Sequence, residues 1–138
     1  MKKPPRSQTL IAVNDVKKSS AWYRKLLDAR ATSVDMQSDH DHIYDRIYQG
    51  DSLLLQLHCW DEEEHPNLMR DGTTKAGHGV LLWYEVDDFD AAVARAKELG
   101  AEIVRDVHRN PPPAHWELWL RDPDGYTVVI VSPDGSAP

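Results

Sequence analysis

The chain is poor in cysteine and basic residues, and it has no long apolar run. Its single cysteine excludes an intrachain disulfide, which is typical of a reducing cytoplasm. No apolar run reaches the roughly 18 residues that a membrane helix needs, and Met1–Gln8 lacks the hydrophobic core of a signal peptide. Sixteen basic against 23 acidic residues give a net charge of −7, which argues against a nucleic-acid partner. We expect a soluble, cytoplasmic protein with neither a nucleic-acid nor a membrane partner.

Tryptophan is the aromatic residue that the chain does have in number. There are five tryptophans and one phenylalanine among the 138 residues. An indole combines a large flat face with a polar N–H, and proteins use it frequently where ligands dock. This composition favours a binding surface over a purely aliphatic core.

An internal repeat organises the sequence. A shift of 73 residues places 8–58 on 81–131, so that Asp15 falls on Asp88 and both follow an apolar run. One repeat, about 55 residues, would be marginally stable alone, so we expect one domain, 1–138, with a shared core. Its modules are predicted at about 7–60 and 79–132, with a polar linker at 61–77.

Each half is predicted to run strand, helix and then three strands. Apolar periodicity and turn residues place the first-half strands at 8–13, 32–36, 43–49 and 52–60, with a helix at 16–27. The second-half strands are placed at 80–86, 103–108, 115–120 and 126–132, with a helix at 88–99 that stops at Gly100. Two such βαβββ units make an α+β fold.

Three stretches are similar to one known superfamily. They are Val13–Leu27 with its Trp22-Tyr23-Arg24-Lys25-Leu26-Leu27 run, Glu85–Glu102, and Asp122–Tyr126. The chain resembles, over roughly 8–132, the glyoxalase/bleomycin-resistance/extradiol-dioxygenase superfamily, also called vicinal oxygen chelate proteins. The resemblance implies two βαβββ modules whose strands form a curved eight-stranded mixed-sheet cup around the site. It leaves the activity open, because this fold hosts lyases, oxygenases, epimerases and drug-binding proteins.

The resemblance also implies four metal-ligand positions, which fall here on Gln8, Gln56, Leu81 and Val129. Leucine and valine offer no donor, and two neutral amides do not offset the desolvation of a dication. We therefore expect no metal and no cofactor, and we assign the two glutamines to hydrogen bonding in the pocket. In character the chain is most similar to the metal-free, bleomycin-resistance-like members.

The side chains expected to line the site follow from strand alternation and from the register that the resemblance implies. They are Gln8, Tyr44, Arg46, Gln56, His58, Trp83, His115, Glu117 and Trp119. Three alternatives remain open. A slip of one residue would exchange Trp119 for Trp116, the tryptophans Trp83 and Trp119 would serve as core filler, or His58 and His115 would be solvated or hydrogen-bonded at the rim.

Two functions are consistent with this lining. The first is a small-molecule-binding protein, expected as a homodimer, that sequesters a planar, partly cationic compound such as an antibiotic between tryptophans. The alternative is a glyoxalase-like lyase, isomerase or dioxygenase-type enzyme acting on a small carbonyl or aromatic substrate. It would use Glu117 or His115 as a general base and Arg46 to stabilise an oxyanion.

Overall fold

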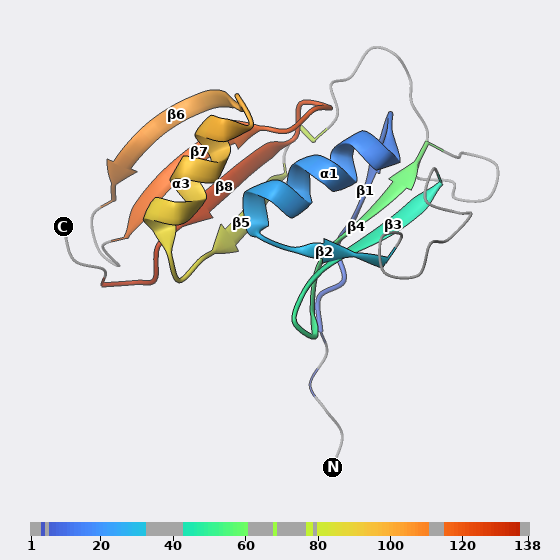
Figure 1. The fold of residues 1–138 in the computed structure, drawn as a ribbon, viewed down its shortest axis with the longest axis horizontal. Coiled ribbons are helices and arrows are strands. Elements are labelled where there is room, and N and C mark those ends of the chain that lie inside the picture. Colours follow the sequence, from blue (N-terminus) through green and yellow to red (C-terminus); the bar gives the residue numbers. More distant parts are fainter. Residues whose placement is uncertain are drawn as a thin grey trace. The chain divides into compact units, whose positions relative to one another are not determined.

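The protein divides into two compact units, Met1–Arg70 and Asp71–Pro138. The structure is a computed structural model that describes residues 4, 6–32, 43–60, 68, 77–78, 80–110 and 115–135. The boundary between the units falls within the expected linker at 61–77, most of which lies outside the described residues. Each unit has its own four-stranded sheet and its own helix (Figure 1).

The first unit builds its sheet in the order β1-β4-β3-β2, with β1 parallel to β4 and the other pairs antiparallel. Its elements are β1 (Leu10–Val13), α1 (Val16–Leu27), β2 (Arg30–Ala31), β3 (Tyr44–Gln49) and β4 (Ser52–Cys59). Gly50 adopts φ +57° in the turn between β3 and β4, where a side chain would be strained.

The second unit repeats this arrangement in the order β5-β8-β7-β6, again with its first and last strands parallel. Its elements are β5 (Leu81–Glu85), α3 (Phe89–Glu98), β6 (Glu102–Arg109), β7 (Trp116–Arg121) and β8 (Thr127–Val131). The predicted α+β class and the two βαβββ modules are therefore confirmed, and the eight strands found among the described residues lie in two sheets of four.

The ladders reproduce the repeat residue by residue. On β4, Gln56 lies between one partner on β1 and one on β3, and on β8 Val129 occupies the equivalent place. The ladder partners are Leu10 and Arg46 in the first unit and Trp83 and Trp119 in the second. All three pairs of equivalent residues are 73 positions apart, so the shift seen in the sequence is the shift of the hydrogen-bonded ladders.

The helix starts follow the same shift. Asp15 accepts a hydrogen bond from the amide of Lys18 at 3.0 Å, and Asp88 accepts one from the amide of Ala91 at the same distance. A side-chain oxygen at this position satisfies an amide that the first helical turn leaves unpaired. Local capping chemistry therefore begins both helices where the sequence predicted.

The repeat slips by one residue where the helices end. A left-handed residue follows each helix, and it is Asp28 (φ 52°) after α1 and Gly100 (φ 63°) after α3, which are 72 positions apart. The abrupt turn at Asp28 lets Arg30 pair directly with Tyr48. Strand β2 occupies Arg30–Ala31, and the strand expected at 32–36 lies, from residue 33 on, outside the described part of the chain.

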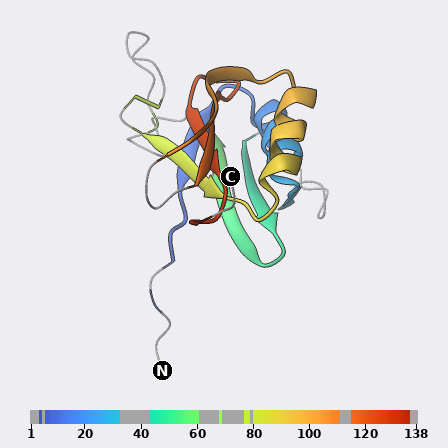
Figure 2. The ribbon, with the colours of Figure 1, turned by 90° about the vertical axis from the view of Figure 1, so that its left-hand side faces the viewer.

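Each sheet has an apolar side that packs against its helix. In the first unit α1 contacts β3 and β4, where Ile47, Leu55 and Leu57 are fully buried. In the second unit α3 lies along one side of its sheet (Figure 2) and contacts β8, where Val128 and Ile130 are fully buried. Successive strand residues point to opposite sides, so the residues between these positions form the other side of each sheet. No helix among the described residues is long and apolar enough to cross a membrane.

Candidate functional site

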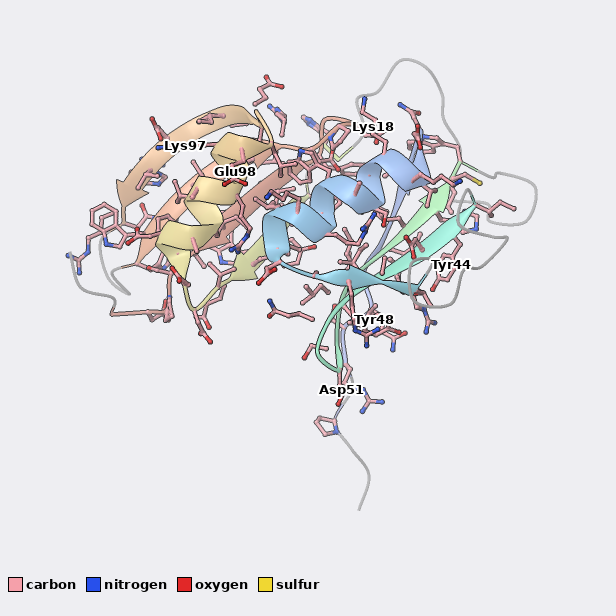
Figure 3. The ribbon with its side chains drawn as sticks, in the orientation of Figure 1. Lys18, Tyr44, Tyr48, Asp51, Lys97 and Glu98 are labelled. Carbon is pink, nitrogen blue, oxygen red and sulfur yellow. The ribbon has the colours of Figure 1, made fainter. Side chains whose placement is uncertain are left out.

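The side of the first sheet that faces away from α1 is polar, and we call it the first face. Gln56 and His58 alternate with the buried leucines of β4, and their ladder partners on β3 are Arg46 and Tyr44. Directly opposed residues share a face. Tyr48 lies two residues beyond Arg46 on the same strand, and both tyrosines are labelled on β3 in Figure 3. Alternation therefore gathers Tyr44, Arg46, Gln56 and His58 as the sequence predicted.

A directed chain of hydrogen bonds joins the first face. Gln56 Nε2 donates to the main-chain oxygen of Gln8 at 2.9 Å, so Gln56 Oε1 is left to accept, and it accepts from the Tyr44 hydroxyl. Arg46 Nε donates to the Tyr44 oxygen at 2.5 Å, and Arg46 Nη1 donates to the Tyr48 oxygen at 3.3 Å. These two hydrogen bonds raise the pKa of Arg46.

Gln8 is the expected member whose side chain the structure does not bring to the first face, whereas His58 lies on it. Gln8 contributes its main-chain oxygen, and its side chain is exposed, so the structure does not bring that amide into the group. His58 is buried, with Nδ1 at 2.7 Å from the Cys59 oxygen and its ring centroid 6.0 Å from that of Tyr44. His58 is thus hydrogen-bonded rather than solvated.

The corresponding side of the second sheet is built around a carboxylate, and we call it the second face. Glu117 and Trp119 on β7 pair with Val131 and Val129 on β8, so both point to the side away from the apolar layer. Trp116 alternates to the opposite side. The register of β7 and β8 therefore places Trp119, rather than Trp116, on the second face.

Glu117 is 1 % exposed and accepts four hydrogen bonds. The donors are His115 Nε2 at 2.6 Å, Trp119 Nε1 at 2.9 Å, His108 Nε2 at 3.2 Å, and Asn110 Nδ2. Both carboxylate oxygens are occupied, because Oε1 accepts from Trp119 and His108 while Oε2 accepts from His115 and Asn110. A buried carboxylate needs this degree of satisfaction to remain ionised.

The electrostatics of the second face favour a charged pair. Burial disfavours the ionised form of Glu117, but the hydrogen bonds from Trp119, His115 and Asn110 outweigh it and lower its pKa. The hydrogen bond to Glu117 raises the pKa of His115 against the effect of burial, and Asp134 Oδ1, 3.1 Å from Nδ1, raises it further. His115 is buried between these two carboxylates, so it is not a solvated rim residue either.

Trp83 provides the open aromatic surface of the second face. Its ring centroid lies 6.5 Å from that of Trp119 and 6.1 Å from that of His115, with interplanar angles of 80° and 81°. Edge-to-face contacts of this kind are favourable between aromatic rings. The residue is nonetheless 46 % exposed, so Trp83 does not serve as core filler.

The four positions at which the superfamily places metal ligands do not suit a divalent ion here. Leu81 and Val129 are aliphatic, and the amide of Gln56 already spends its oxygen on Tyr44 and its nitrogen on Gln8. Among the described residues there is no group of three His, Cys, Asp or Glu side chains that could hold a metal ion. This donor set fits hydrogen bonding and stacking.

Sequence reasoning missed four residues that complete the two faces. They are Tyr48, His108, Asn110 and Asp134. Tyr48 had a usable signal, since it lies two positions after Arg46 on one strand. The partners of Glu117 and His115 come from β6 and from segments outside the strands, where pairing cannot be counted from alternation.

Comparison with known proteins agrees with this architecture. A family model described as Glyoxalase/Bleomycin resistance protein/Dioxygenase superfamily matches residues 7–130. A glyoxalase/bleomycin resistance protein/dioxygenase family enzyme from Burkholderia phytofirmans is 20 % identical with a TM-score of 0.70, over 91 % of this chain and 96 % of that chain. Lactoylglutathione lyase from Agrobacterium tumefaciens is 20 % identical with a TM-score of 0.64, over 96 % and 97 %.

A hypothetical protein from S. aureus is 15 % identical with a TM-score of 0.70, over 95 % of both chains. None of the curated proteins compared with this chain matches it. Likeness at these identities shows the fold, whereas the family match spans both βαβββ units. The chain therefore belongs to the Glyoxalase/Bleomycin resistance protein/Dioxygenase superfamily.

Proposed function

We propose that this protein binds a planar aromatic small molecule without the help of a metal, sequestering a compound such as an antibiotic. The observation that carries the proposal is the exposed indole of Trp83, held by perpendicular contacts to Trp119 and His115. A ring that is already oriented loses little conformational freedom when a ligand stacks on it. Stacking contributes about 0.5–1.5 kcal/mol beyond the burial of apolar area.

The same geometry supports binding over the alternative of a lyase, isomerase or dioxygenase-type enzyme. A general base needs an oxygen or nitrogen within reach of the substrate proton. Both oxygens of Glu117 accept hydrogen bonds inside the protein, and both ring nitrogens of His115 face carboxylates. These two residues act as a rigid support for Trp119.

We do not expect the Glu117 carboxylate to select a cationic ligand. A cationic ligand would have to displace one of four donors from a carboxylate that is 1 % exposed. Removing a partner from a buried, hydrogen-bonded charge is costly. We therefore assign the selectivity of the second face to ring stacking.

We also propose that the protein forms a homodimer. Strand β6 lies at the edge of its sheet and exposes three apolar side chains, Ile103, Val104 and Val107. Open edges with apolar residues are usually covered by another chain or protected by charge. Light scattering measures the molar mass of the parent and of Val104→Lys, in which a charge replaces an exposed apolar residue of this edge. A monomeric parent would contradict the proposal.

The aromatic site is tested by tryptophan quenching with cationic and anionic planar probes, acridine orange and anilinonaphthalene sulfonate. Trp83→Ala should weaken binding roughly ten- to a hundredfold, which corresponds to about 1.4–2.8 kcal/mol. Its free energy of unfolding should stay near that of the parent, because much of the ring is exposed. Trp60→Phe, which changes a tryptophan of the first unit, is the matched control and should bind as the parent does.

Chelation separates the metal-free part of the proposal from the binding itself. Dialysis against a strong chelator should leave the quenching unchanged. Loss of binding after chelation would contradict metal independence, while unchanged binding by Trp83→Ala would contradict the assignment of the second face.

A further inference from the structure

The first face holds a cation whose described partners are all neutral. Arg46 donates through Nε to Tyr44 and through Nη1 to Tyr48, and no other hydrogen bond to its side chain occurs among the described residues. None of the carboxylates in that part of the chain forms an ion pair with it. The side chain is half-buried, so its charge is only partly hydrated.

The hydrogen-bond chain fixes the direction in which the guanidinium points. Because Gln56 Nε2 donates to Gln8, Gln56 Oε1 must accept, and the Tyr44 hydroxyl spends its only proton there. The Tyr44 oxygen can then only accept, and it accepts from Arg46 Nε. Guanidinium is planar, so fixing Nε and Nη1 also fixes Nη2.

We propose that Arg46 is the centre of an anion-binding site on the first face, and that the site takes a carboxylate. One N–H of Nη1 and both N–H groups of Nη2 remain for an incoming ligand. An arginine fork uses one N–H from each of two nitrogens, and it matches the planar pair of carboxylate oxygens. One guanidinium balances one monoanion. A phosphate dianion would need further donors than this face offers among the residues described.

Two features favour the binding of an anion in place of water at the Arg46 guanidinium. The neutral tyrosine partners orient Arg46 without neutralising it, in contrast to the carboxylate-paired His115 of the second face. The Arg46 guanidinium carbon also lies 5.8 Å from the Tyr44 ring centroid, so the ring supports its position. All residues of this site belong to the first unit, so the site does not depend on the aromatic site at Trp83.

The test uses sodium acetate as the probe, with sodium chloride added to hold the ionic strength constant. In a nitrogen-15 spectrum of the full chain, the Nε–Hε resonance of Arg46 should shift and reach a plateau as acetate is added. Chloride at the same ionic strength should not cause this shift. Arg46→Gln should weaken acetate binding, read from neighbouring amides, by tenfold or more, since a hydrogen bond to a charged group contributes about 1.5–3 kcal/mol.

Further variants separate a binding role from a structural one. Arg46→Lys keeps the charge but loses the fork, and should bind acetate several-fold more weakly than the parent. Tyr44→Phe removes the hydroxyl that orients Nε and should also weaken binding several-fold while keeping the ring. Arg105→Gln removes an exposed charge from β6 and is the control that should leave acetate binding unchanged.

Three outcomes would overturn the proposal. They are the absence of a saturable shift in the parent, equal acetate binding by Arg46→Gln, and tighter binding of inorganic phosphate than of acetate at equal ionic strength. Acetate has no ring, so failure here leaves the aromatic proposal standing. Conversely, Trp83→Ala should bind acetate normally even if aromatic probes no longer bind to it.

Discussion

The two sheet faces use the same backbone positions for opposite chemistry. Tyr44 and Glu117 are equivalent residues of β3 and β7, and Arg46 and Trp119 follow two positions later on each strand. In both units the later residue donates a hydrogen bond to the earlier one, at 2.5 Å in the first unit and 2.9 Å in the second. The first unit thus places a cation on a neutral acceptor, and the second places a neutral ring on an anion.

The remaining equivalent positions sharpen this contrast. Gln56 and His58 on β4 correspond to Val129 and Val131 on β8. On the first strand of each unit, half-buried Leu10 corresponds to the exposed Trp83. The first face therefore gathers hydrogen-bonding and charged side chains, and the second gathers aromatic rings around a buried carboxylate.

The largest expected effect comes from the anion of the second face. Glu117→Gln removes the charge on which four donors converge, and breaking such a buried pair costs about 3–5 kcal/mol. Urea unfolding of the variant and the parent measures the loss. A change below about 1 kcal/mol would show that the carboxylate does not organise this face.

The next largest effect should be a pH dependence of the free energy of unfolding that arises from the second face. The raised pKa of His115 makes its contribution complete below the ordinary value of 6.5 and lost as pH rises through the folded-state value. The lowered pKa of Glu117 makes its contribution complete above 4.5 and lost as pH falls through its folded-state value. This pair therefore stabilises the fold most between these two ordinary values.

Urea midpoints measured from about pH 6 to about pH 9 check the alkaline side of this prediction. The groups that face His115 are Glu117 and Asp134, and His108 shares Glu117. His115→Gln should flatten the alkaline decline. An equally steep decline in that variant would assign the pH dependence to other groups.

The neutral acceptor of the first face should matter less for stability. Tyr44→Phe deletes one hydroxyl that accepts from Arg46 and donates to Gln56, at a cost of about 1 kcal/mol. The same urea experiment measures it. If Tyr44→Phe proved as costly as Glu117→Gln, the contrast between a neutral and a charged centre would be lost.

The smallest expected effect is a difference between the two helix caps. Asp15→Ala and Asp88→Ala should each cost about 1 kcal/mol, and by nearly equal amounts, because each removes one side-chain hydrogen bond to a first-turn amide. Thermal unfolding of both variants compares them. Unequal costs would show that the units diverge in their frameworks as well as in their faces.

Local patterns carried most of the fold. The helix starts and the two-residue alternation depend on residues close together in the chain, and the repeat is a match of one stretch of sequence with another, so each can be recognised without a structure. Alternation also selected Trp119 over Trp116 once the register of β7 and β8 was known. Where the structure describes them, strand bounds differ from the predicted ones by at most two residues. The early start of β2 at Arg30 follows the left-handed Asp28, which no periodicity marks.

The candidate site depended on information that the sequence does not contain. His108 is the ladder partner of Glu117, but β6 pairs with β7 through two irregularities, so its register cannot be counted. Asn110 reaches the same carboxylate from beyond the end of that strand. Alternation could assign Trp83 to a face, but exposure depends on what covers the face.

The 73-residue register also keeps the surface of each sheet separate from the layer that packs on its helix. Face residues such as Gln56 alternate with helix-side residues such as Leu55 and Leu57, so the two layers accept substitutions separately. Leu55 and Leu57 correspond to Val128 and Ile130 of the second unit, so the helix side stays aliphatic in both units while the opposite face differs. One ladder pattern therefore supports two different surfaces within one molecule, and either surface can be altered without changing the layer that packs on its helix.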